Sequence, residues 1–424
     1  MYYRKRAADA LLARKLAGKG AVLIEGPKWC GKTTTAEQQA ASIIYMDDPQ
    51  HIEQNKIRAD INPSLLLQGK TPRLIDEWQI APKLWDAVRY EADHRDGTGH
   101  FILTGSSLPV DNKDIQHSGT GRFAWLRMRP MALYESGESS GEISLEDLFS
   151  APGSIYAENR LSMEDIAFLI CRGGWPKAID QNKDIALDQS FDYCDAITNR
   201  DISKVDNINR NPERVKRLMR SYARLQGSQA SYETICADIK SNDTTTLDSD
   251  TVAAYITALG RLFVIEEAQA WNPNLRSKTA IRTSATRYYI DPSIGTAILQ
   301  TGPEELLADI KTMGLFFETL CMRDLRTYAE ALMGTVYHYR DSSGLECDAV
   351  VHLRNGSYGL VEIKLGGTHL ISEGCRTLKT LSERIDTDRM KAPSFLMVLT
   401  GIGDIAYRRK EDGIYIVPIG CLKQ

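Results

Sequence analysis

The chain has 424 residues, of which 25% are charged and 42% hydrophobic, and its formal net charge is −4. This balance predicts two or three folded domains and excludes a disordered chain. The net charge implies no overall basic surface, so binding to nucleic acid would need a local one. No apolar run reaches 18 residues and the eight cysteines form no C-x-x-C pair, so we expect a soluble, cytoplasmic protein without a membrane span, zinc site or disulfide framework.

The segment 26–33 matches the phosphate-binding loop pattern G-x-x-x-x-G-K-[ST]. An apolar run at 21–25, expected to be a buried strand, precedes it, and a helical pattern at 34–42 follows. An ordinary glycine-rich turn would not require this context, so we expect bound ATP held by loop N–H groups and the helix start. Lys32 would reach the β/γ-phosphates and the Thr33 hydroxyl would ligate Mg²⁺. The expected ATP-binding residues are Gly26, Pro27, Gly31, Lys32, Thr33 and Thr34.

A short apolar run at 73–77 ends in two carboxylates, Asp76 and Glu77. Ligands of nucleotide-binding α/β sheets lie at the carboxyl ends of the strands, so both acids are expected to face the phosphates. Asp76 is placed to hold Mg²⁺ through water. Glu77 is placed to orient or deprotonate the attacking water.

A further buried strand is expected at 101–107, ending in small hydroxyl residues. We expect Ser106, slightly ahead of Thr104, to sense the γ-phosphate or position the water. Arg122 follows on a flexible loop, where a surface salt bridge is the alternative to a catalytic role.

Four strings in this region, at 26–34, 73–82, 103–107 and 121–122, resemble the AAA+ superfamily and, within it, a widespread prokaryotic group of predicted ATPases. The resemblance implies that Asp76 and Glu77 form the Walker B pair and that residues 104–106 carry sensor 1. It also implies that Arg122 is an arginine finger. Such fingers usually act across a subunit boundary, so the resemblance implies a homo-oligomer, such as a hexamer.

Residues 171–176 resemble the G-x-P motif in the lid of related ATPases, where Pro176 would line the adenine pocket. A Gly-Gly-x-Pro turn between helices is the alternative.

Residues 155–225 show helical periodicity, and the helix that begins at 211–212 carries Arg214, Arg217 and Arg224 on one face. This face could track a phosphate backbone, although a solvated helix face is the commoner explanation. The stretch 231–266 resembles a winged helix. Its candidate recognition helix lacks Lys and Arg, so sequence-specific base reading is not expected, and the module could simply pack against its neighbours.

Two strands are expected at 345–353 and 358–365, joined by a hairpin at 354–356. Glu362 and Lys364 are two residues apart and project from one face of their strand. A two-residue Asn-Gly turn would pair residue 348 with 363 and place Asp348 on the wrong face. A three-residue loop with a left-handed Gly356 would pair 348 with 362 and bring the three groups together.

Glu318 is expected on a helix, aimed at a mostly apolar surface, where a carboxylate is costly unless it is paired or binds a metal. Carboxylates clustered beside a lysine suit metal-dependent phosphodiester hydrolysis. Asp348 and Glu362 would hold Mg²⁺ or Mn²⁺, while Lys364 would steady the attacking oxygen or the developing charge.

The ordered set of Glu318, Asp348, Glu362 and Lys364 resembles the catalytic residues of the PD-(D/E)XK restriction-endonuclease superfamily, which includes Holliday-junction resolvases. The same ATPase group characteristically ends in such a domain. The resemblance implies branched or single-stranded DNA as a partner, although many domains of this superfamily bind DNA without cutting it.

The expected fold class is therefore α/β, with an AAA+ P-loop core of parallel strands at 1–150, a helical lid and winged-helix-like domain at 151–275, and a restriction-endonuclease-like domain at 276–424. Two functions remain open. One is an oligomeric ATPase that processes DNA. The other is an ATP-controlled assembly switch whose C-terminal domain binds a protein partner and does not cleave DNA.

Overall fold

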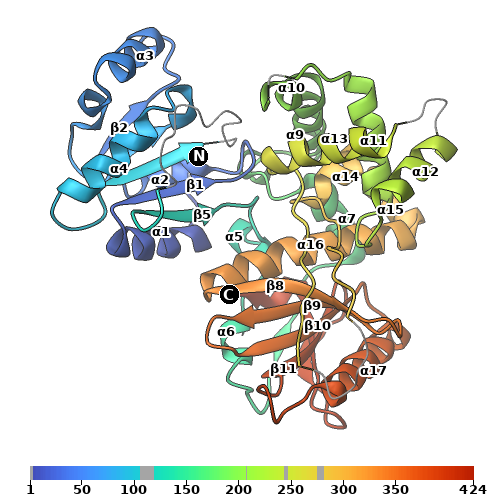
Figure 1. The fold of residues 1–424 in the computed structure, drawn as a ribbon. Coiled ribbons are helices and arrows are strands. Elements are labelled where there is room, and N and C mark those ends of the chain that lie inside the picture. Colours follow the sequence, from blue (N-terminus) through green and yellow to red (C-terminus); the bar gives the residue numbers. More distant parts are fainter. Residues whose placement is uncertain (1–2, 106–118, 207, 243–246, 275–280) are drawn as a thin grey trace. The chain divides into compact units, whose positions relative to one another are not determined.

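The computed structural model describes residues 3–105, 119–206, 208–242, 247–274 and 281–424 (Figure 1). The chain divides into two units. The first comprises 1–130, 196–211 and 256–264, and the second comprises 131–195, 212–255 and 265–424.

The first unit is built on a five-stranded sheet with the order β2-β3-β4-β1-β5, in which all neighbouring strands are parallel (Figure 1). Every residue of the strands β1 and β4 is buried, as expected for a parallel sheet covered on both faces. The parallel sheet predicted for this region is confirmed. The strands are β1 (Ala21–Glu25), β2 (Ser42–Tyr45), β3 (Arg73–Asp76), β4 (Phe101–Gly105) and β5 (Phe123–Arg127).

Helices and an aromatic cluster complete this unit. Trp85 stacks on Phe123 with ring centroids 4.0 Å apart, and Trp78 and Phe101 are buried in the same apolar cluster. The helix after the phosphate loop is shorter than predicted, because the N–H of Ala41 already bonds to Pro72 O beside β2. The helices are α1 (Ala7–Gly18), α2 (Lys32–Glu37), α3 (Ile52–Ile61), α4 (Leu84–His94) and α10 (Ile202–Lys204), with short turns η1 (Pro63–Leu67), η2 (Trp78–Ile80) and η4 (Ile197–Asp201).

The second unit contains a seven-stranded mixed sheet with the order β7-β12-β13-β11-β10-β9-β8. The central strands β10, β11 and β13 are parallel, and the other pairs are antiparallel. The strands are β7 (Ala157–Glu158), β8 (Gly334–Arg340), β9 (Glu346–Leu353), β10 (Tyr358–Lys364), β11 (Phe395–Thr400), β12 (Ile405–Arg408) and β13 (Tyr415–Pro418); β6 (Ile143–Ser144) pairs separately with β14 (Leu422–Lys423).

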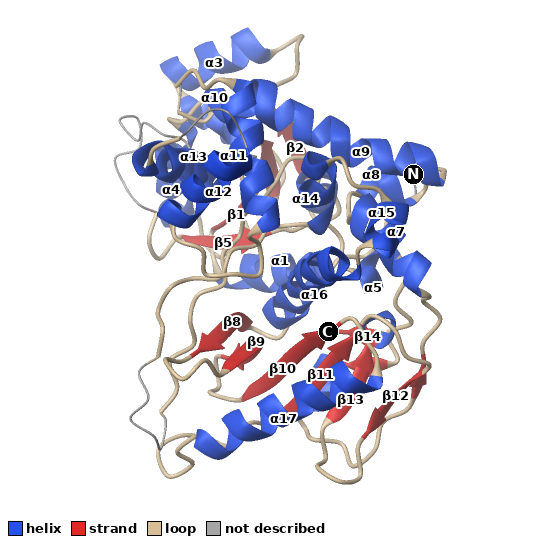
Figure 2. Ribbon diagram, turned by 90° about the vertical axis from the view of Figure 1, so that its right-hand side faces the viewer, coloured by secondary structure: helices blue, strands red, loops and turns tan. Residues whose placement is uncertain are grey.

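Two long helices, α16 (Ile310–Ala331) and α17 (Thr368–Arg384), cover opposite faces of this sheet (Figure 2). Alternate residues of β10 divide between them. Val361 lies in the apolar cluster of α16, whereas Leu360 lies in that of α17. This period of two is the reason that residues 360, 362 and 364 share one face.

The remaining helices belong largely to residues 133–308. The basic side chains of α11 are engaged within the protein: Lys216 pairs with Asp195 and Arg224 with Asp238. This arrangement favours the structural explanation of that helix face over a phosphate track. The helices are α5 (Leu133–Ser136), α6 (Leu145–Leu148), α7 (Met163–Arg172), α8 (Pro176–Ile179), α9 (Lys183–Ala196), α11 (Pro212–Arg224), α12 (Tyr232–Asn242), α13 (Ser249–Arg261), α14 (Pro292–Leu299) and α15 (Pro303–Ala308), and a short turn, η5 (Ile419–Cys421), precedes β14.

The expected domain boundaries at 150 and 275 differ from the observed division. The first stretch of the first unit runs to Pro130, because residues 131–150 pack with the second unit, and two later stretches, 196–211 and 256–264, return to the first unit. The Ser139 hydroxyl donates to Leu422 O at 2.7 Å, beside the pairing of β6 with β14. After α13, where the winged-helix interpretation expects a wing, the structure has isolated β-bridges that pair Ile265 with Tyr289 and Ala268 with Thr286. These long-range pairings leave no periodic signal in the local sequence.

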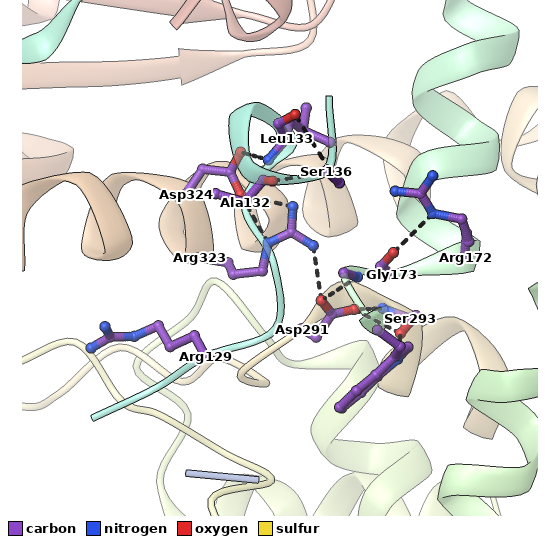
Figure 3. Close-up of polar contacts among 12 residues, drawn as sticks. Arg129, Ala132, Leu133, Ser136, Arg172, Gly173, Asp291, Ser293, Arg323 and Asp324 are labelled. Carbon is purple, nitrogen blue, oxygen red and sulfur yellow. Dashed lines mark hydrogen bonds and ion pairs between the residues drawn. The ribbon is translucent and has the colours of Figure 1, made fainter. Parts of the chain in front are cut away.

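A buried ion cluster ties the second unit together (Figure 3). Arg323 of α16 donates through Nη1 to Asp291 Oδ2 at 2.8 Å and through Nε to Asp324 Oδ1 at 2.8 Å. All three side chains are at most 1% exposed. Each acid also accepts a hydrogen bond from a backbone N–H: Gly174 donates to Asp291, and Leu133 donates to Asp324.

This cluster accounts for the Gly-Gly-Trp-Pro stretch. A Cβ on Gly174 would lie 2.2 Å from the Met131 carbonyl oxygen, and the Met131 N–H donates to Gly174 O at 2.7 Å. The Trp175 indole donates to Ser293 Oγ, and Pro176 begins α8. These contacts favour the turn between helices, and a contact of Pro176 with adenine stays a prediction.

Replacing Arg323 by methionine is expected to lower the free energy of unfolding by about 3–5 kcal/mol, because two buried carboxylates lose their counter-charge. Urea unfolding of the full chain measures this loss. Arg389→Met is the matched control, since Arg389 is 73% exposed and its ion pair with Asp386 should contribute about 0–1 kcal/mol. Equal losses in the two variants would contradict the role given to the cluster.

Candidate functional site

The phosphate loop connects the end of β1 to the start of α2, and its glycines are required by geometry. Gly31 has φ +94°, and a Cβ on Gly26 would lie 2.2 Å from the Met128 carbonyl oxygen. The ammonium of Lys32 is buried within the loop, where it donates to the carbonyls of Gly26 at 2.9 Å and Pro27 at 2.8 Å. The lysine therefore lies where the motif expects the phosphates. Thr34 follows within α2.

Asp76 joins three elements at the carboxyl edge of the parallel sheet. Its Oδ1 accepts the Thr33 hydroxyl of α2 at 2.7 Å and the Thr104 hydroxyl of β4 at 2.5 Å. Burial raises the pKa of Asp76, and the two hydroxyl donors oppose that shift. Thr33 and Asp76 are oxygen donors in direct contact, so they suit Mg²⁺, which takes few protein ligands and completes its shell with phosphates and water.

Glu77 is the next residue, and its backbone is left-handed at φ 53°. This conformation costs a non-glycine residue about 1–3 kcal/mol and is typical of functional positions. Its carboxylate accepts a hydrogen bond from Gln79. Burial raises the pKa of Glu77, while the nearby Lys32 ammonium lowers it. A carboxylate with a raised pKa is a better general base near neutral pH.

The hydroxyl that the structure brings into this site is that of Thr104, which is buried against Asp76. Sequence reasoning ranked Ser106 ahead of Thr104, and Ser106 lies outside the described residues. Parallel register explains the position of Thr104, since β4 lies between the strand of the phosphate loop and the strand of Asp76.

Arg122 directly precedes β5, at the amino edge of the same sheet. Its carbonyl accepts the N–H of Ala21, the first residue of β1. The phosphate loop leaves the other end of β1, about 13 Å away along a five-residue strand. The Arg122 guanidinium is 48% exposed and pairs with Asp93 at 2.6 Å, so the surface salt bridge considered from the sequence is present.

The hairpin of the second unit has the register expected for a three-residue loop. Leu353 N–H donates to Ser357 O at 2.8 Å, and Gly356 is left-handed at φ +82°. The pairing continues to Val361 opposite Ala349, which places residue 362 opposite residue 348.

Asp348 also lies in a β-bulge of β9. Tyr337 pairs with Val350 and Tyr339 with Cys347, so β9 advances three residues while β8 advances two. The Asp348 Oδ2 accepts the Ile363 N–H at 2.7 Å, which satisfies a backbone donor of β10. Bulges commonly re-aim a side chain beside an active site.

The three groups predicted to converge in this sheet do so. Lys364 Nζ lies 3.2 Å from Asp348 Oδ2 and 2.7 Å from Glu362 Oε2. Burial raises the pKa of Glu362 to about 8, with Asp348 adding to the shift and Lys364 opposing it. Although burial lowers the pKa of Lys364, the two carboxylates outweigh this effect and raise it.

Glu318 of α16 is electrostatically close to this cluster. Burial raises its pKa to about 8, and the Asp348 charge is the next largest cause. Its carboxylate accepts the hydroxyl of Tyr288, a residue that sequence reasoning did not single out. Tyr288 lies in the apolar run Tyr288-Tyr289-Ile290, and only the fold shows that its hydroxyl meets an acid.

We call the group formed by Glu318, Asp348, Glu362 and Lys364 the carboxylate–lysine cluster. It contains three carboxyl groups and one ammonium, so full ionisation of the acids would leave it with a net negative charge. In donor type this carboxylate–lysine cluster suits Mg²⁺ or Mn²⁺ at Asp348 and Glu362. Within the described ranges, however, no three His, Cys, Asp or Glu side chains are arranged to hold an ion.

Comparison with known proteins addresses the first unit most directly. Residues 18–136 match the family model described as AAA domain. This part of the chain is therefore similar to an AAA domain. The match supports ATP binding and hydrolysis, with Mg²⁺ as the ion that accompanies the nucleotide.

The rest of the chain matches families without a described activity. Residues 163–305 match a domain of unknown function, DUF8612, and residues 313–422 match another, DUF4143. The endonuclease-like fold and DNA binding therefore stay predictions. In the part of the chain that the structure describes, no helix has the length and apolar character needed to span a membrane.

Individual relatives are distant. Two proteins described as uncharacterized, Mb2031c of Mycobacterium bovis and Rv2008c of Mycobacterium tuberculosis, are each 23% identical over 382 residues, which cover 89% of this chain and 77% of theirs. The Walker-type ATPase PABY2304 of Pyrococcus abyssi aligns with a TM-score of 0.44 and 14% identity, covering 70% of this chain and 96% of that chain. Likeness at this level carries no conclusion about function.

Proposed function

We propose that this protein is an ATP-hydrolysing enzyme that acts as a homo-oligomer and whose C-terminal carboxylate–lysine cluster engages DNA. The observation that carries the ATPase part is the contact of Asp76 with both Thr33 and Thr104 beside the phosphate loop. Through these two contacts the Asp76 carboxylate, at the end of β3, is joined to both α2 and β4.

Each residue of this edge has a distinct task in the proposed reaction. The Lys32 ammonium balances phosphate charge, and Thr33 and Asp76 would hold Mg²⁺, which supplies further charge neutralisation. The Glu77 carboxylate, with its pKa raised by burial, takes the proton of the attacking water. Gln79 holds that carboxylate by a hydrogen bond.

Replacing Glu77 by glutamine should reduce ATP turnover by at least about 10²-fold and leave nucleotide binding intact, because the amide cannot accept the proton. Lys32→Ala should instead weaken binding itself. Steady-state hydrolysis together with titration of a fluorescent ATP analogue separates the two effects. Glu53→Gln, an exposed acid of the same unit, is the control. Hydrolysis at the normal rate by the Glu77 variant would refute its assignment.

Arg122 supports the oligomer part of the proposal. It lies at the edge of the sheet opposite to its own phosphate loop and is half exposed. Because Arg122 is far from its own phosphate loop, the proposal has it act on a nucleotide held by a neighbouring copy. The Asp93 ion pair would hold its guanidinium until that neighbour binds.

Mixing Arg122→Ala subunits with Glu77→Gln subunits should restore part of the hydrolysis that each variant lacks alone, because a mixed interface can pair an intact arginine with an intact glutamate. The rate is measured across mixing ratios, with light scattering to verify mixed assembly. If mixed oligomers form and no ratio restores activity, Arg122 does not act between subunits.

The proposal for the C-terminal cluster rests on the ion pairs that join both Asp348 and Glu362 to Lys364. Glu318 and Glu362 are buried there, and burial raises the pKa of both carboxyl groups. Burying such groups is costly, whereas apolar side chains in the same place would carry no such cost. Lys364 can contact a phosphodiester, and bound Mg²⁺ or Mn²⁺ would supply a Lewis acid. The rival function is an ATP-controlled switch whose C-terminal domain binds a protein.

With Mg²⁺ or Mn²⁺, the full chain should cleave branched or single-stranded DNA, and Asp348→Ala should abolish cleavage while ATP hydrolysis persists. Gel electrophoresis of labelled substrates measures the first activity, and phosphate release the second. Glu373→Gln, an exposed acid of α17, is the control. DNA binding without cleavage would leave a DNA-binding domain. No binding at low salt would favour the switch.

A further inference from the structure

A cavity of about 490 Å³ lies in the second unit, away from the residues assigned above. Its walls come from the loop after α11, the first turn of α12, residues 281–284 and the end of β8. These segments are far apart in the sequence and belong to elements of different type. None of the sequence motifs accounts for the cavity.

The lining is cationic and rich in donors. It includes the guanidinium-bearing residues Arg282 and Arg340, together with Ser228, Gln229 and Thr234. The backbone N–H of Arg282 donates to Arg340 O at 2.9 Å, which holds the two arginines side by side. Among the described residues that form its walls, none is acidic. Such a surface favours an anion with several oxygens.

Two contacts connect this cavity to the carboxylate–lysine cluster. Arg340 is paired in register with Glu346, and its Nε lies 2.7 Å from Glu346 Oε1. Glu346 precedes Asp348 by two residues on β9, which is about 7 Å along a strand. Gly227, which directly precedes the lining residue Ser228, abuts the Glu318 carboxylate, because a Cβ on Gly227 would lie 3.2 Å from Glu318 Oε2.

We propose that this cavity binds a backbone phosphate of single-stranded DNA, next to the phosphodiester that faces Lys364. The inference rests on the proposed DNA engagement by the C-terminal cluster. Arginine matches phosphate oxygens bidentately, and hydroxyl and amide groups are common backbone contacts. A phosphate on Arg340 takes the place of the Glu346 carboxylate.

The charge balance of the neighbouring cluster supports this ligand. Asp348 and Glu362 both pair with Lys364, and the Asp348 charge helps to raise the pKa of Glu318. A polyanion that approaches these acids is repelled wherever they are ionised and hold no cation. Arg282 and Arg340 bring two guanidinium groups beside that cluster, of which Arg340 is paired with Glu346. Arg282 is exposed at the rim, so a strand can reach it from solvent. Electrostatic attraction at this cavity offsets the repulsion at the acids.

The test uses the full chain and fluorescence anisotropy of a labelled single-stranded oligonucleotide at several salt concentrations. Arg282→Gln and Arg340→Gln should each weaken binding about fivefold near 0.1 M salt, and each should reduce the slope of log K against log salt by about 0.7, as for loss of one phosphate contact. Arg354→Gln, which removes an exposed charge on the 354–356 hairpin loop, should bind as the unmodified protein does.

Three results would overturn the inference. If the unmodified protein binds no DNA at low salt, the proposed DNA engagement fails and the inference fails with it. If that protein binds DNA and the Arg282 variant matches the Arg354 control, only the cavity assignment fails. If inorganic phosphate, at matched ionic strength, raises the thermal midpoint of the unmodified protein but not of Arg282→Gln while their DNA affinities agree, the cavity binds free phosphate instead.

Discussion

The second unit depends on one fully buried ion cluster, in which Arg323 lies between Asp291 and Asp324. Each acid also binds a backbone N–H from a distant segment, so the cluster joins α16 to residues 131–133, to the glycine turn at 173–174 and to the start of α14. A buried arginine with two acids tolerates few alternative geometries, because any unpaired charge would be very costly. The cluster therefore holds residues 131–133 against α16 within the second unit.

The two candidate sites use carboxylates in opposite ways. In the AAA domain, hydroxyl donors of Thr33 and Thr104 satisfy Asp76, and the Lys32 ammonium is buried in the phosphate loop. In the second unit, three carboxyls gather near one lysine, and burial raises the pKa of both Glu318 and Glu362 to about 8. The first arrangement is complete without a further charge. The second is balanced only by protons or by a bound cation.

Backbone irregularities create both sites. Glu77 adopts a left-handed conformation at the end of β3, and Asp348 occupies a bulge of β9. In each case a regular strand would direct the side chain elsewhere, since side chains alternate strictly between the faces of a sheet. The β8 strand, which pairs with β9 across this bulge, also carries Arg340 to the cationic cavity.

The amino-acid sequence by itself determined the phosphate loop, the Asp76–Glu77 pair and the E-x-K strand, because these signals are local: glycine spacing, a short apolar run and a period of two. It left the hairpin register open between two turn lengths, and the observed pairing of Val361 with Ala349 decided it. It also placed a domain boundary at 150, where the compact units divide elsewhere, and overlooked Tyr288, Arg323 and the Arg282–Arg340 cavity. Those features depend on contacts between distant segments, such as Leu133 with Asp324, 191 residues apart, and only the tertiary structure brings such segments together.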